Sequence, residues 1–169
     1  SVGNNVLNGD IDSGIWAISY LISMYAHKQS NFTLFQTPKC ILNNAFVTID
    51  DISMHACYMD TSYPLFSKNV SIKKVISDCL KKSNNVHSSL IDIKDMFEID
   101  NERFERPLSQ VGNERFRAMA AIGYAIGKDI FCFPWMSQNR FESFHSNIVG
   151  ILPILESLNK IVILPIGKK

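Results

Sequence analysis

The sequence predicts an α/β fold in which a mostly parallel sheet is covered by helices. Short apolar segments typical of strands alternate with longer segments of helical periodicity along the 169 residues, and this alternation favours parallel pairing. The composition agrees, because 46% hydrophobic and 20% charged residues are typical of a globular protein with a sizeable core. No internal repeat or low-complexity segment is evident, so we expect a single domain over residues 1–169.

The chain opens with a predicted strand and a helix that packs on it. We expect the strand at residues 2–7 and the helix at residues 14–26, because a turn with two glycines separates two apolar runs. Residues 32–35 and 45–49 are predicted to form strands, since apolar and polar positions alternate in the second of them. Residues 51–58 are predicted to form another short extended stretch.

The second half of the chain is predicted to be richer in helices. Residues 70–82 should form an amphipathic helix, because their apolar positions recur at helical spacing. Residues 90–97 are predicted to form another helix, and residues 81–89, rich in lysine, serine and asparagine, a loose surface turn. A helix, a strand, a helix and a strand should then follow one another between residues 114 and 166.

Charge and cysteine content limit the partners and the compartment. The formal net charge is +1 and the lysines are scattered, so no global field attracts nucleic acid or an anionic membrane. No apolar run reaches the length that a bilayer-spanning helix needs, so direct membrane insertion is not expected. The four cysteines lack C-x-x-C spacing and are expected to be reduced, which favours a cytoplasmic setting.

Two glycines with the spacing of a phosphate-binding loop lie between the first strand and the first helix. Gly9 and Gly14 match the pattern G-x-x-x-x-G-K-[ST], in which the lysine holds the β- and γ-phosphates and the hydroxyl binds Mg²⁺. The next two positions hold Ile15 and Trp16, which supply neither group. An ordinary strand, turn and helix with glycines in the turn is the alternative interpretation.

A second segment strengthens the interpretation of Gly9 and Gly14 as a phosphate-binding loop. Leu108, Ser109 and Arg115 precede a small-residue helix, which leads to an apolar strand that is followed by Pro134. These residues resemble the second half of an ATP-binding cassette (ABC) ATPase domain, where the signature LSGGQ-x-x-R precedes a helix and a Walker B strand that ends in Asp-Glu-Pro. Gln110 and Val111 stand where the signature has its two glycines.

The resemblance also places the remaining functional positions of the family. The Walker B Asp and Glu fall on Cys132 and Phe133, and the switch histidine falls on Gly167. The glutamine of the Q-loop falls on Thr61. Each of these positions therefore lacks the residue that the family uses.

The resemblance implies a P-loop NTPase-like core with an inserted α-helical subdomain. The core would comprise about residues 1–62 and 127–169, and the helical subdomain about residues 63–126. Relative to the family, the domain is expected to be truncated at both ends, since the family has a β-region upstream and further strands and helices downstream.

The substitutions predict a pseudo-ATPase with no catalytic residues and no cofactor. Phosphoryl transfer depends on cations and Mg²⁺ around the phosphates, and Asp10 and Asp12 would instead repel a triphosphate. His55 and Cys57 could begin a metal site, but no second pair of ligands follows, so no metal is expected. The degenerate nucleotide-site positions are Gly9, Asp10, Asp12, Ser13, Gly14, Ile15, Trp16, Thr61, Ser109, Cys132, Phe133 and Gly167.

An inactive ABC-like domain is expected to work through protein contacts. Its partner would be a transporter subunit or another ABC-type domain, in a dimer or a larger transport-related assembly, and its place would be the cytoplasm or the periphery of a membrane complex. In the family, the Q-loop and the helical subdomain receive the transporter. By resemblance Tyr63, Leu65 and Phe66 are candidate apolar anchors for the partner, and the alternative is that all three belong to the core.

Two other functions remain open at the level of sequence. The chain could be a small α/β protein that binds a nucleotide or another anion without hydrolysing it, which Gly9 and Gly14 favour and the missing lysine opposes. It could also be an enzyme that uses Ser109 or a cysteine as nucleophile, although no general base stands at a recognisable spacing.

Overall fold

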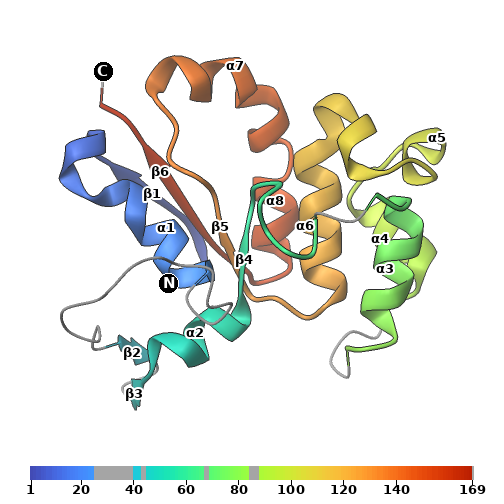
Figure 1. Cartoon of the computed structure of the whole chain (residues 1–169), viewed down its shortest axis with the longest axis horizontal. Coiled ribbons are helices and arrows are strands. Elements are labelled where there is room, and N and C mark those ends of the chain that lie inside the picture. The colour runs from blue at the N-terminus through green and yellow to red at the C-terminus, as the bar shows by residue number, and fades with distance from the viewer. Residues whose placement is uncertain (25–39, 43–44, 67–68, 84–87, 169) are drawn as a thin grey trace.

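A four-stranded parallel sheet with helices on both faces forms the centre of the molecule, and a two-stranded hairpin lies apart from it (Figure 1). The computed structural model describes residues 1–24, 40–42, 45–66, 69–83 and 88–168. The predicted α/β class with a parallel sheet is confirmed. The strand predicted at residues 32–35 lies outside the described residues.

The sheet joins the beginning of the chain to its last part. Its strands are β1 (Gly3–Asn8), β4 (Ala56–Tyr58), β5 (Ile130–Cys132) and β6 (Ile161–Ile166). Their order is β1-β6-β5-β4, and every neighbouring pair is parallel. The carboxyl ends of all four strands therefore meet at one edge of the sheet, where α/β proteins usually bind their ligands.

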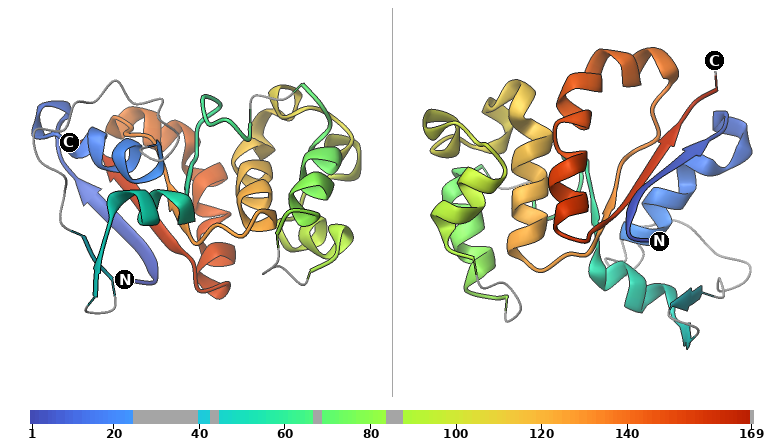
Figure 2. Two further views of the ribbon diagram at one scale, coloured as in Figure 1. Left: turned by 60° about the horizontal axis from the view of Figure 1, so that its bottom comes forward. Right: turned by 180° about the vertical axis from the view of Figure 1, so that it is seen from behind.

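The strand order also explains why helices cover both faces. The connection from β1 to β4 crosses the sheet in one direction, whereas the connections from β4 to β5 and from β5 to β6 step back. Because such crossovers are right-handed, the two sets of helices lie on opposite faces. Accordingly α1 (Ile15–Met24) packs on one face, and α6 (Arg115–Ala125) and α8 (Leu152–Ser157) pack on the other (Figures 1 and 2).

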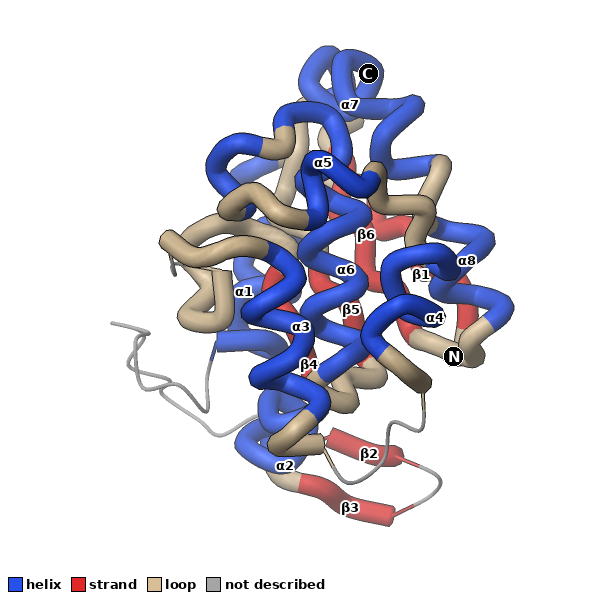
Figure 3. The backbone as a smooth tube through the Cα atoms, turned by 90° about the vertical axis from the view of Figure 1, so that its right-hand side faces the viewer, coloured by secondary structure: helices blue, strands red, loops and turns tan. Residues whose placement is uncertain are grey.

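Three more helices, α3 (Ile72–Leu80), α4 (Leu90–Met96) and α5 (Asn101–Phe104), lie beyond α6 (Figure 3). The first two match the helices predicted at residues 70–82 and 90–97. Because α6 lies between these helices and the sheet, most of its residues are buried, and five of the buried ones are alanine or glycine. Gly123 permits the close approach, since a Cβ there would lie 2.8 Å from Phe131 Cε1. The limits of the helical subdomain, residues 63–126, stay a prediction.

The predicted extended stretch at residues 51–58 is mostly wrong. The structure has the helix α2 (Ile49–His55), and the chain is extended only in β4. A capping box explains the helix: Thr48 Oγ1 accepts the Asp51 N–H at 3.1 Å, and Asp51 Oδ2 accepts the Thr48 N–H at 3.0 Å. The strand predicted at residues 45–49 is shortened to β3 (Ala45–Val47), which pairs antiparallel with β2 (Cys40–Leu42).

Between β5 and β6 the structure has two helices instead of the one predicted. The first, α7 (Gln138–Val149), ends at Gly150, and α8 follows with Pro153 in its first turn, where proline is tolerated. Cys57, Cys79 and Cys132 are buried free thiols, as expected of reduced cysteines. Within the described residues, no helix is both long enough and apolar enough to cross a membrane.

Candidate functional site at the carboxyl edge of the sheet

The glycine loop between β1 and α1 folds back on itself. Residues Ile11–Ser13 form a short 3₁₀ turn (η1), and the Asp10 carbonyl accepts both the Ser13 N–H at 3.0 Å and the Ser13 hydroxyl at 2.5 Å. Gly14 ends the turn with φ 76°, a left-handed conformation that glycine adopts without strain. The Ser13 N–H and the Ser13 hydroxyl therefore both donate to an acceptor within the loop.

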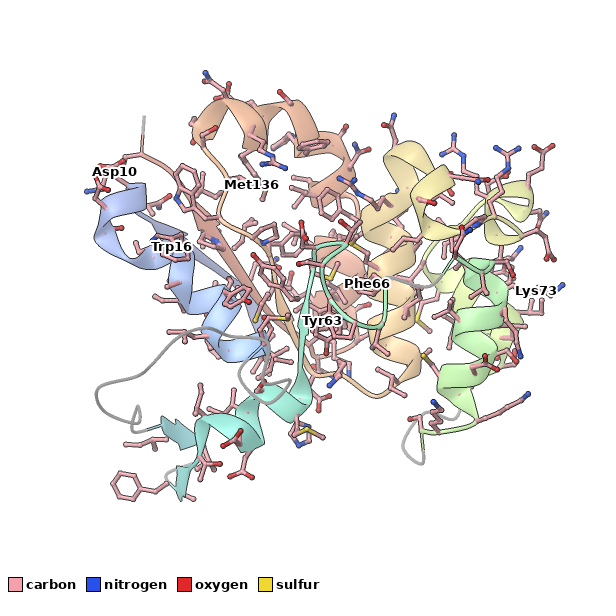
Figure 4. The ribbon with its side chains drawn as sticks, in the orientation of Figure 1. Asp10, Trp16, Tyr63, Phe66, Lys73 and Met136 are labelled. Atoms are coloured by element: carbon pink, nitrogen blue, oxygen red, sulfur yellow. The ribbon has the colours of Figure 1, made fainter. Side chains whose placement is uncertain are left out.

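The side chain of Ile15 fills the space next to the first glycine. A Cβ added to Gly9 would lie only 2.1 Å from Ile15 Cδ1, and 2.6 Å from Ser13 Oγ. Ile15 thus packs directly on Gly9, at the position where the resemblance places the phosphate-binding lysine. Asp10 and Asp12 are exposed, and Figure 4 shows Asp10 at the tip of the loop. Trp16 lies further along α1 with 40% of its surface exposed.

After β5, residues 133–136 run alongside β6 as far as the carboxyl end of that strand. The N–H of Phe133 donates to Ile163 O at 2.9 Å, and the N–H of Met136 donates to Pro165 O at 3.2 Å. Gly167 returns a hydrogen bond from its N–H to Met136 O at 2.8 Å. This path places Trp135 beside the carboxyl end of β6.

Trp135 spans from the end of β5 to the glycine loop. Its indole Nε1 donates to Gly9 O at 3.1 Å, and a Cβ on Gly167 would lie 3.1 Å from its Cζ2. Gly167 therefore gives the indole room to pass over the end of β6. We call Gly9, Ile15, Trp135 and Gly167 together the closed loop. Sequence reasoning missed Trp135, although its place directly after Pro134, at the carboxyl end of a predicted strand, was a usable signal.

Cys132 and Phe133, where the resemblance places the Walker B acids, are completely buried. The Cys132 carbonyl accepts the Met59 N–H at 2.8 Å, and the Phe133 ring lies 5.7 Å from the Phe116 ring, centroid to centroid. Burial raises the pKa of the Cys132 thiol, so the thiol stays neutral. Neither side chain offers an oxygen ligand to a hard cation such as Mg²⁺.

The remaining predicted positions lie elsewhere. Thr61 is exposed and forms part of the wall of a small cavity between the ends of β4 and β5 and the helices α6 and α7. Ser109 is exposed in a 3₁₀ turn, Leu108–Gln110 (η3), which precedes α6. The structure therefore brings the glycine loop and Gly167 together, and it assigns Thr61 to a second site on the same edge.

Tyr63 and Phe66 are buried in the core, which favours the alternative interpretation of these residues over a role as partner anchors. Tyr63 is 0% and Phe66 5% exposed, and their rings pack on each other at 5.4 Å, centroid to centroid (Figure 4). The Tyr63 hydroxyl also donates to Ala56 O at 3.0 Å. Leu65 is half-buried against the same core, and its role as a partner contact stays a prediction.

Three titratable side chains, Asp129, His55 and Lys160, lie together at the amino edge of the sheet. Asp129 Oδ2 lies 3.2 Å from His55 Nδ1, and its Oδ1 accepts a hydrogen bond from Lys160 Nζ at 2.7 Å. Partial burial opposes ionisation of Asp129, but Lys160 and then His55 outweigh it and lower the pKa of this carboxyl. Cys57 is buried, away from the exposed His55 side chain, and no cluster of metal-ligating side chains occurs among the described residues.

Comparisons with known proteins agree on the architecture. No protein-family model matches the chain, and no curated protein matches its sequence. A solved Pyrococcus furiosus structure, described as an ABC transporter ATP-binding protein, is 18% identical and superposes with a TM-score of 0.61 over 98% of this chain and 79% of its own. The chain has the fold of an ABC ATP-binding domain.

Two further structures share this ABC-like fold. CbiO1 from Clostridium perfringens, part of an ABC transporter complex, is 10% identical, with a TM-score of 0.64 over 99% of this chain and 67% of its own. A dimeric ATP-binding cassette with bound ADP and Pi is also 10% identical, with a TM-score of 0.55 over 99% of this chain and 75% of its own. At these identities the likeness concerns the fold alone.

Proposed function

We propose that this chain is a catalytically inactive ABC-like protein that acts as a structural or regulatory partner in a transport-related or larger assembly. The observation that carries the proposal is the closed loop. Ile15 packs on Gly9, and the Trp135 indole is hydrogen-bonded to the Gly9 carbonyl. In an ABC-like fold this is the place where phosphates would have to lie.

The chemistry of the closed loop opposes nucleotide binding. Phosphate groups need cations and hydrogen-bond donors around them, whereas Ile15 supplies an apolar surface. The donor of Trp135 is already used on Gly9 O, and Asp10 and Asp12 add negative charge to the loop. A triphosphate would have to displace Ile15 and Trp135 and overcome that repulsion.

The partner is expected to be a protein. One structure with this fold is a dimer and another is part of an ABC transporter complex. By this likeness the partner would be a transporter subunit or a second ABC-type domain. The formal net charge of +1 gives no reason to expect nucleic acid instead.

A nucleotide titration tests the proposal. The purified chain is titrated with ATP and with ADP, each with and without Mg²⁺, while its melting temperature and phosphate release are followed. We expect neither a saturable shift nor release above the blank at millimolar nucleotide, in an assay that detects an active ABC domain. The same result is expected for Ile15→Lys, because Cys132, Phe133 and Gly167 still lack the family's groups.

A positive result would be located with two glycine variants. Gly14 and Gly127 both have positive φ, 76° and 85°, so valine strains both backbones. Only Gly14 belongs to the glycine loop, and Gly127 lies in the turn after α6. Phosphate release that Gly14→Val abolishes and Gly127→Val keeps would overturn the proposal. A saturable shift without release, lost in the same pattern, would instead favour a protein that binds nucleotide without hydrolysing it.

A further inference from the structure

The small cavity beside Thr61 lies at the other end of the same carboxyl edge. Its volume is about 20 Å³, and it is enclosed by the ends of β4 and β5, the first turn of α6, and α7. Such a volume accommodates one small group rather than a nucleotide. Figure 4 places Met136, which forms part of the wall, between α7 and the sheet. The rest of the apolar wall includes Phe116, Met119 and Phe144.

Two arginines without a carboxylate partner meet at this cavity. The chain has five arginines, and three of them form ion pairs: Arg103 with Glu114, Arg106 with Glu102, and Arg117 with Glu98. The other two, Arg115 and Arg140, form no ion pair with any described residue. Both belong to the wall of the cavity.

The local field adds to this positive charge. Arg115 begins α6 and Arg140 is in the first turn of α7, and neither first turn contains an acidic residue. Helix amino termini carry partial positive charge, which adds to the charges of the two arginines in the wall. Asp60 is the one carboxylate in the wall, and its Oδ1 already accepts the Ser62 N–H at 2.9 Å. The Arg115 guanidinium carbon lies 5.5 Å from the centroid of the Phe116 ring, so this charge also faces the apolar wall. The wall thus carries two positive charges and one negative charge, with no ion pair between them.

We propose that this cavity binds a carboxylate group, held by the guanidinium groups of Arg115 and Arg140. A planar carboxylate matches the fork of an arginine, and its single charge balances the excess left after Asp60. A phosphate dianion fits less well, because the space is small and Asp60 repels a second charge. The proposal does not depend on whether the chain binds or hydrolyses ATP, since the closed loop lies at the other end of the edge.

The test follows the arginine side chains by NMR during a titration with acetate. Each of the five arginines gives one Nε–Hε signal, which is assigned with arginine-to-lysine variants. We expect the signals of Arg115 and Arg140 to move saturably, while those of the three paired arginines stay in place. Equal movement of all five signals, or the same movement with sodium chloride, would overturn the proposal.

Variants at two surface arginines sharpen the result. Arg140→Met should weaken acetate binding about tenfold, because one of the two charge-assisted partners is lost. Arg106→Met is the matched control, since it removes an exposed arginine that is already paired with Glu102, and it should bind acetate as the unchanged chain does. Equal losses in both variants would contradict the assignment, and circular dichroism checks that both are folded.

Two more ligands identify the source of the carboxylate. Inorganic phosphate at matched ionic strength should bind more weakly than acetate, and tighter phosphate binding would overturn the choice of ligand. A short capped peptide with one aspartate is titrated in parallel. Binding tighter than acetate, with the same dependence on Arg140, supports an acidic side chain of a partner protein. Binding no tighter than acetate supports a free small carboxylate at the same site.

Discussion

The two ends of the carboxyl edge of the sheet differ in how their polar groups are satisfied. At the end formed by β1 and β6, Ile15 covers Gly9 and the Trp135 indole donates to the Gly9 carbonyl. At the end formed by β4 and β5, Arg115 and Arg140 form part of the wall of a cavity, and neither forms an ion pair with a described residue. The first end is closed by the chain's own side chains, and the second keeps charge that the described chain does not neutralise.

The fold determines where a site can be, and the side chains decide whether one exists there. In open α/β sheets, ligands bind outside the carboxyl ends of the strands. Here an ABC-like fold fills one part of that edge and leaves donors at another. Three experiments test the contrast, and they follow in order of expected effect.

Removing the indole should have the largest effect. Trp135→Ala deletes the side chain that joins β5, Gly167 and Gly9, and we expect the free energy of unfolding to fall by about 2 kcal/mol. Urea unfolding followed by circular dichroism measures it. Trp135→Phe keeps most of the packing and loses only the donor to Gly9 O, so it should cost about 1 kcal/mol. An unchanged unfolding midpoint for Trp135→Ala would show that the loop is not held closed by the indole.

Adding one methyl group inside the closed loop should have the next largest effect. Gly9→Ala places a Cβ 2.1 Å from Ile15 Cδ1, so we expect a loss of about 1.5 kcal/mol from overpacking. Ile15→Val removes that Cδ1, and the double variant should therefore be more stable than the sum of the two single changes predicts.

The neighbouring glycine provides the control for this cycle. Gly14→Ala meets no atom within 4 Å and should lose about 1 kcal/mol through its positive φ alone. Ile15→Val should not rescue it. Strict additivity of Gly9→Ala and Ile15→Val in urea unfolding would mean that Ile15 does not lie against Gly9.

The smallest effect concerns the amino edge, where the charges are paired. The pKa of Asp129 in the folded chain is lowered from 3.8, so its contribution to stability is full above about pH 4 and is lost as the pH falls below that value. Half of the side chain is exposed, so the contribution should stay below about 1 kcal/mol. Asp129→Asn should flatten the dependence of stability on pH in this acidic range.

Arg140→Met is the comparison variant for the amino edge. It removes a charge with no carboxylate partner among the described residues, and should leave the acidic slope as it is in the unchanged chain. The measurement is urea unfolding at several pH values below neutrality. The same slope in Asp129→Asn and in the unchanged chain would refute the stabilising role of the contacts with Lys160 and His55.

Regular elements were predictable where local pattern and tertiary packing agree. The helix α3 follows from the spacing of Val75, Ile76 and Cys79, and all three are buried as that spacing requires. At residues 51–58 the prediction overlooked a local signal, because the capping box of Thr48 and Asp51 starts a helix in a segment that was predicted to be extended. The acidic residue three positions after a threonine was the signal that went unused.

The candidate site was predictable only in part. The spacing of Gly9 and Gly14 located the loop, but a spacing does not reveal which side chain fills it. Trp135 reaches the loop because its chain follows β6 beyond the end of β5, and this path depends on hydrogen bonds between segments that are distant in sequence. The meeting of Arg115 and Arg140 likewise depends on how α6 and α7 are placed, which no local pattern specifies.

The pairing of β1 with β6 joins two strands that are synthesised at different times. Gly3 lies in register with Ile161, so β1 leaves the ribosome long before its neighbour in the sheet exists. At ordinary elongation rates this interval is on the order of ten seconds. The residues between β4 and β5 are complete earlier and have partners close in sequence. Of the four strands of this sheet, β1 is thus synthesised first and paired last, because its neighbour β6 is synthesised last.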